Sequence, residues 1–167
     1  MSTAHVIRPL TMAAQGEREV VMTRSFAASR ERVFDAWTKP ELVKRWFGGQ
    51  GFSIPECEID LRPGGRYRWV MQHESMRIVM KGVYREVTRP DRLITTQEWE
   101  GFSETGWRPE DDTINTMVLT ELDGGTLWTA TIRYASREVR DAALRDPNQQ
   151  NGMNMSLAKL DEVLASL

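Results

Sequence analysis

Residues 153–167 read MNMSLAKLDEVLASL, and the rest of the chain is arranged around them. Apolar side chains recur at spacings of four, three, four and three residues, at Met153, Leu157, Leu160, Leu164 and Leu167. This spacing predicts an amphipathic helix with one apolar stripe. Asp146 and Pro147 suit its N-cap and first position, which gives a helix of roughly 18 residues and about 27 Å. Such a stripe must pack against the apolar face of another layer.

The sequence before this helix predicts consecutive antiparallel strands. Alternating or apolar runs indicate strands at residues 19–26, 52–61, 66–73, 77–87, 92–99, 115–122 and 126–134. Two turns have the chemistry of tight connections, RPGG at residues 62–65 and DGG at residues 123–125. A twisted sheet of this size bends around a long helix, and a gap remains between them wherever side chains do not meet.

Two short helices are predicted directly after the first strand. Ser29 can cap the first helix, which runs to about Trp37. Pro40 suits the start of the second helix, which runs to about Trp46. The chain is therefore expected to be an α+β protein, with a curved antiparallel sheet of about six or seven strands wrapped around a long C-terminal helix.

The organisation is that of one domain. A chain of 167 residues falls within the usual size of a single domain. Residues 1–17 lack clear periodicity and predict a loose N-terminal arm, so the domain is expected at residues 18–167. Residues 100–114 are polar, contain glycine, and predict a long loop.

Composition excludes several classes of function. Basic and acidic residues number 22 and 24 for a net charge of -2, which is not the basic footprint of a nucleic-acid-binding protein. No apolar run approaches the roughly 20 residues of a membrane span, and the N-terminus has no signal-peptide core. Cys57 is the only cysteine, which rules out an intrachain disulfide. These features indicate a cytoplasmic protein.

Sequence motifs for cofactors and metals are also missing. The chain has no phosphate-binding loop, no dinucleotide fingerprint, no nucleophile elbow and no zinc-protease motif. Two histidines and one cysteine are too few for an ordinary zinc site. No cofactor and no metal are therefore expected.

Four segments carry a family resemblance. Residues 24–48 read RSFAASRERVFDAWTKPELVKRWFG, residues 57–66 read CEIDLRPGGR, residues 82–86 read GVYRE, and Gly152 precedes the leucine stripe. Together they resemble the heat-shock-protein ATPase activator homologues of the SRPBCC, or START-related helix-grip, superfamily, over about residues 18–165. The resemblance implies a helix-grip fold with a deep cavity. Members of the wider superfamily bind lipids, hormones and polyketides, and some are cyclases.

The expected ligand-binding residues lie where the apolar strand faces, the end of the second helix and the start of the last helix meet. They are Trp46, Phe47, Trp69, Met71, Met80, Tyr84, Trp99, Met117, Gly152 and Met153. Pockets for small molecules are mostly apolar, and methionine and aromatic side chains suit their walls. Each of these residues has an alternative interpretation as ordinary core, because core and cavity wall share one face in this architecture.

Candidates for catalysis are fewer. His73, Tyr84 and Glu98 are weak candidates for acid–base chemistry, and His73 has no identifiable partner in the sequence, so no catalytic residue is assigned. Cys57 has no activating neighbour and is expected to be structural. The predicted function is therefore binding of a small apolar or aromatic molecule. The alternatives are a cyclase-like or dehydratase-like enzyme using the same cavity, and a chaperone-associated interaction module. An exposed sheet edge could also support a homodimer.

Overall fold

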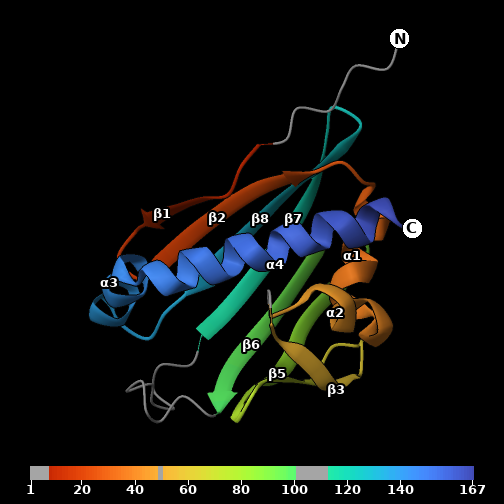
Figure 1. Ribbon diagram of the computed structural model, residues 1–167. Helices are drawn as coiled ribbons and strands as arrows, with labels where there is room; N and C mark the ends of the chain where they lie inside the picture. The colour runs from red at the N-terminus through yellow and green to blue at the C-terminus, as the bar shows by residue number, and fades with distance from the viewer. Residues whose placement is uncertain (1–7, 49–50, 101–112) are drawn as a thin grey trace.

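A computed structural model describes residues 8–48, 51–100 and 113–167. The described residues form eight strands and four helices (Figure 1): β1 (Thr11–Gln15), β2 (Glu19–Phe26), α1 (Arg30–Thr38), α2 (Pro40–Trp46), β3 (Ser53–Ile59), β4 (Arg66–His73), β5 (Met76–Thr88), β6 (Arg92–Glu100), β7 (Thr113–Leu122), β8 (Gly125–Arg133), α3 (Arg137–Arg145) and α4 (Pro147–Ala165). The strands form one antiparallel sheet in the order β1-β2-β8-β7-β6-β5-β4-β3. In Figure 1, α4 crosses one face of this sheet from α3 to α1 and α2. The predicted α+β helix-grip arrangement is confirmed.

The sheet has one strand more than the sequence indicated. Strand β1 lies within the residues expected to form a loose arm, and it pairs with β2 from Thr11 opposite Thr23 to Gln15 opposite Glu19. Its sequence, TMAAQ, lacks an apolar alternation, so its strand structure comes from backbone pairing with β2. Strands β1 and β3 are the two edges of the sheet. Residues 1–7, and most of the predicted loop at 100–114, lie outside the described residues.

Helix α3 is the second element that the sequence pattern did not indicate. The Ser136 hydroxyl caps it by accepting a hydrogen bond from the backbone N–H three residues later. Arg140 is only 4% exposed and reaches from α3 to the turn between β1 and β2. Its Nη1 atom donates to the carbonyl oxygens of Gln15, Gly16 and Glu19, at 3.4, 3.1 and 2.9 Å. A buried cation therefore attaches α3 to the first hairpin.

The main core lies between the helices and the sheet face that α4 crosses, called here the inner face. Helix α4 contributes its predicted stripe, since Leu157, Leu160 and Leu164 are buried. The sheet contributes directly paired residues such as Met117 and Ala130, which share a face because they stand opposite each other. Burial of each large apolar side chain contributes roughly 1.5–3 kcal/mol.

The two halves of α4 differ in how they are held. Arg24 of β2 binds Asp161 with both guanidinium nitrogens, at 2.8 and 2.5 Å, and this ion pair fixes the second half against the sheet. In the first half, residues 147–155, Met153 is half-buried and every other side chain that the structure describes is exposed. No helix in the described parts of the chain is long and apolar enough to cross a membrane.

Candidate functional site

The inner face of the sheet is covered unevenly. At its α1 end, Met117, Leu119 and Trp128 are fully buried. Toward the ends of β6 and β8 and the start of β7, several inner-face side chains are only half-buried. We call these side chains, together with the half-buried residue of α4 that packs on the same core, the inner-face site: Gln97, Trp99, Asn115, Ile132 and Met153.

Three of the predicted ligand-binding residues form one row across the sheet. Trp69 of β4 stands opposite Met80 of β5, which stands opposite Trp99 of β6. Trp69 and Met80 are buried in the main core, whereas Trp99 is half-buried and contacts both the main core and a smaller apolar cluster. That smaller cluster contains Met71. The row therefore runs from the core to the inner-face site.

Trp46 and Phe47, at the end of α2, have different surroundings. Trp46 is 1% exposed, and its indole nitrogen donates to the Ala36 carbonyl oxygen at 2.9 Å. Trp46 is therefore a core residue in the structure, as the alternative to a ligand-binding role had it. Phe47 is half-buried, and its ring lies edge-on to those of Trp46 and Trp69, at 5.4 and 4.7 Å between centroids. Phe47 thus joins α2 to the tryptophan row.

The two predicted residues of α4 also lie on different sides of the helix. Gly152 is exposed, and a Cβ atom built there would meet nothing within 4 Å. Met153 packs against the main core. Of these two positions, only Met153 contributes to the inner-face site.

The three candidates for acid–base chemistry do not come together. Tyr84 is buried on the inner face, and burial raises the pKa of its phenol well above the usual value. Glu98 is exposed, and it stands opposite Lys81 on the outer face. His73 lies at the end of β4 with its ring 5.2 Å from that of Phe52. Tyr84 alone faces the interior beside the site.

Sequence reasoning missed four polar residues of the inner face, which are Thr95, Gln97, Thr113 and Asn115. Tyr84, Thr95, Asn115 and Ile132 stand opposite one another in one row across β5–β8. Gln97 and Thr113 pair in the next row. The signal was present in the alternation of β7, where Asn115 shares a face with Met117 and Leu119.

Three buried polar side-chain atoms have no hydrogen-bond partner within the described part of the chain. They are Trp69 Nε1, Asn115 Oδ1 and Trp128 Nε1. Buried polar groups are nearly always paired in folded proteins, so each such atom needs an explanation. Asn115 belongs to the inner-face site, and Trp69 stands in the row that leads to it, where a bound molecule could pair with them.

Cys57 adjoins the tryptophan row, because it stands opposite Trp69. Burial raises the pKa of its thiol to about 11. At pH 8 the native thiol is therefore expected to react with 5,5′-dithiobis(2-nitrobenzoic acid) about 100-fold more slowly than the same thiol in urea-unfolded protein, because only the thiolate reacts. The rate should rise with pH toward that pKa. Equal rates for native and unfolded protein would contradict this placement of Cys57.

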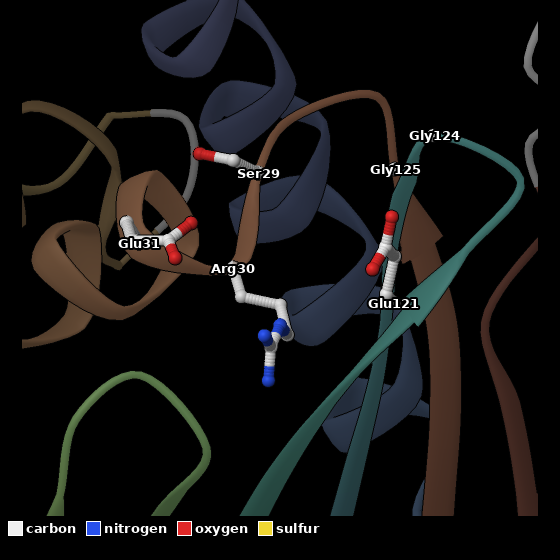
Figure 2. A pocket seen from close by; sticks show the side chains of 6 residues that line it. All are labelled: Ser29, Arg30, Glu31, Glu121, Gly124 and Gly125. Carbon is white, nitrogen blue, oxygen red and sulfur yellow. The ribbon is translucent and has the colours of Figure 1, made fainter.

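The surface has two hollows that lie apart from the inner-face site. A groove of about 450 Å³, called here the outer groove, lies between Gly51 and the C-terminal helix. It is lined by Gly51, Met155, Ala158, Lys159 and Glu162. A hollow of about 170 Å³ lies between the start of α1 and the β7–β8 turn, lined by Ser29, Arg30, Glu31, Glu121, Gly124 and Gly125 (Figure 2). Figure 2 shows the Arg30 and Glu121 side chains entering it from α1 and β7. Neither hollow is lined by a residue of the inner-face site.

Groups of three or more metal-ligating side chains are not found among the described residues. The inner-face site offers indole, thioether, aliphatic and amide groups. Such groups can contact an apolar body and form hydrogen bonds with a polar group on it.

An open antiparallel sheet crossed by a C-terminal helix, with two short helices after its second strand, defines a protein of the helix-grip class. The family described as Activator of Hsp90 ATPase homolog 1-like protein matches residues 27–165. The chain belongs to this family. No curated protein matches it.

Solved structures share the fold over nearly the whole chain. A protein from Rhodobacter sphaeroides is 26% identical with a TM-score of 0.84, and the alignment covers 95% of this chain and 99% of that one. A protein from Nitrosomonas europaea is 27% identical with a TM-score of 0.76, covering 92% and 98%. A Mycobacterium smegmatis protein, 22% identical with a TM-score of 0.80 and covering 95% and 99%, shares the fold.

Proposed function

We propose that the protein binds a small apolar or aromatic molecule between the inner face of the sheet and the first half of α4. The observation that carries this proposal is the uneven covering of the inner face. Trp99, Ile132 and Met153 stand on the core side of their elements yet remain half-buried. Covering such apolar surface is worth about 25 cal/mol per Å², and most sites for small molecules are built this way.

The surrounding structure supports a preformed site. Leu157 and Leu160 anchor the second half of α4 in the core, and the ion pair of Arg24 with Asp161 holds it to β2. The sheet supplies the opposite wall through hydrogen-bonded strands. Side chains on such elements keep their positions better than side chains on loops, which lowers the entropic cost of binding.

Two methionines of α4 provide a matched test. Met153 packs toward the core, whereas Met155 is 42% exposed and lines the outer groove. We expect Met153→Ala to weaken binding of N-phenyl-1-naphthylamine about 5-fold to 10-fold, because roughly half of an apolar contact is lost. Met155→Ala should leave the affinity unchanged. The measurement is a titration of the fluorescence of this uncharged probe.

The wild-type protein should bind the probe saturably, with about one molecule per chain. Unsaturable fluorescence would contradict the proposal. So would equal effects of the two substitutions, because the probe would then not distinguish the two sides of α4.

Family membership favours a second candidate function, a chaperone-associated role. A change in the rate of ATP hydrolysis by purified Hsp90 on adding the protein would support it, and no change at saturating concentration would count against it. An enzymatic role has less support, because Tyr84 is the one candidate group beside the site, and its raised pKa keeps the phenol protonated.

A further inference from the structure

Both walls of the inner-face site are free of charge in their described side chains. The rows that contain Trp99, Gln97 and Asn115 hold aromatic, apolar, amide and hydroxyl groups. The first half of α4, residues 147–155, reads PNQQNGMNM and has no ionisable side chain. A charged ligand group would lose its hydration here without gaining a counter-ion, which is strongly unfavourable.

Two hydrogen bonds within the protein use polar side chains in or beside these rows. The Thr113 hydroxyl donates to Gln97 Oε1 at 3.3 Å. The Tyr67 hydroxyl donates to the Thr96 carbonyl oxygen, beside the Tyr84 ring. The hydroxyl groups of Thr113 and Tyr67 therefore already have hydrogen-bond acceptors within the protein.

Asn115 differs from them. Its side-chain oxygen is buried and has no hydrogen-bond partner among the described residues, although the residue as a whole is half-buried. Its neighbours across the strands are Thr95 and Ile132. An unpaired buried acceptor costs about 1–3 kcal/mol, which a donor on a bound molecule would recover.

We propose that Asn115 is the polar end of the ligand site, where its amide oxygen accepts a hydrogen bond from an uncharged aromatic molecule that carries a hydroxyl group. This inference rests on the proposed function and names the ligand class. The aromatic body lies against Trp99 and Met153, and the hydroxyl group points toward β7. A site built around one unpaired acceptor discriminates strongly against analogues that lack the donor.

Four compounds with the same naphthalene body test this proposal. By calorimetry at neutral pH, 2-naphthol should bind about 10-fold more tightly than 2-methoxynaphthalene, which keeps the oxygen but has no donor. Naphthalene should resemble the methyl ether. The anion 2-naphthoate should bind about 100-fold more weakly than 2-naphthol.

Substitution of Asn115 tests whether this residue causes the preference for 2-naphthol. Asn115→Leu should bind 2-naphthol and 2-methoxynaphthalene with affinities within about 2-fold of each other. Thr116→Val is the control, because Thr116 is the next residue of β7 and faces the other side of the sheet. This variant should keep the full preference.

The outcomes distinguish a failure of the proposed Asn115 contact from a failure of the proposed function. If the three neutral compounds bind wild type with equal affinity, the ligand site stands and the role of Asn115 is overturned. A preference for 2-naphthol that survives Asn115→Leu also overturns it. If none of the neutral compounds binds, the proposed function itself is wrong. The wild-type comparison remains decisive even if Asn115→Leu does not fold.

Discussion

Replacing Trp46 by alanine is expected to lower the free energy of unfolding by about 4 kcal/mol, the largest effect of any single substitution considered for this fold. The Trp46 indole is buried between α1 and α2, where it contacts the rings of Trp37 and Phe47 at 4.6 and 5.4 Å between centroids. Alanine would leave a cavity and would also leave the Ala36 carbonyl oxygen without its donor. Guanidinium denaturation followed by circular dichroism measures the loss.

Two comparisons show whether this loss comes from packing. Trp46→Phe should cost about half as much, because the ring is kept and the hydrogen bond is lost. Leu61→Ala should cost less than about 0.5 kcal/mol, because Leu61 is a partly exposed residue outside the core. A cost for Trp46→Ala close to that of Leu61→Ala would show that Trp46 is not a core residue.

The second large effect is expected at Arg140. Its Nη1 atom donates to three backbone carbonyl oxygens around the β1–β2 turn. Arg140→Ala should lower the free energy of unfolding by about 3 kcal/mol, because buried acceptors lose a charged donor. Amide hydrogen exchange in β1 should also become faster, since α3 would no longer be attached to this hairpin.

Arg137 provides the matched control on the same helix. Its side chain is largely exposed and lies 3.8 Å from Asp141, so Arg137→Ala should change the stability by less than about 0.5 kcal/mol. Similar stabilities for the two variants would mean that Arg140 does not hold α3 in place.

Most of the fold could be predicted from local patterns. The strands at 66–73 and 19–26, the proline-initiated helix α2, and the leucine stripe of α4 all appear where capping and periodicity placed them. Strand β1 and helix α3 could not be predicted in this way. The sequence TMAAQ becomes a strand by pairing with β2, and α3 depends on a long-range contact through Arg140. Local patterns do not contain such contacts.

The candidate site was predictable in composition but not in position. Alternation placed Trp69 on the apolar face of its strand and Met80 on that of the next, and these two residues stand opposite each other. For Trp99 the alternation was ambiguous, because both faces of its strand are partly apolar. Alternation could not indicate which of these residues α4 leaves half-buried, because this depends on how α4 is anchored by Asp161 and the leucines. Asn115 was overlooked because a single polar residue in a strand is usually assigned to the solvent side.

The fold and the proposed function are connected through α4. Its second half completes the core, and its first half has no ionisable side chain. Under the proposed function, one helix serves stability at one end and ligand binding at the other. Substitutions in the two halves should accordingly separate these properties.

The most direct test is nuclear magnetic resonance of protein labelled with [¹³C]methyl-methionine, titrated with N-phenyl-1-naphthylamine. Met80 and Met153 lie on the core side, whereas Met76 and Met155 are 51% and 42% exposed. Binding between the inner face and α4 predicts large shifts of the Met80 and Met153 methyl signals, with those of Met76 and Met155 unchanged. Shifts confined to Met76 or Met155 would contradict the account, because the probe would then occupy exposed surface away from the inner-face site.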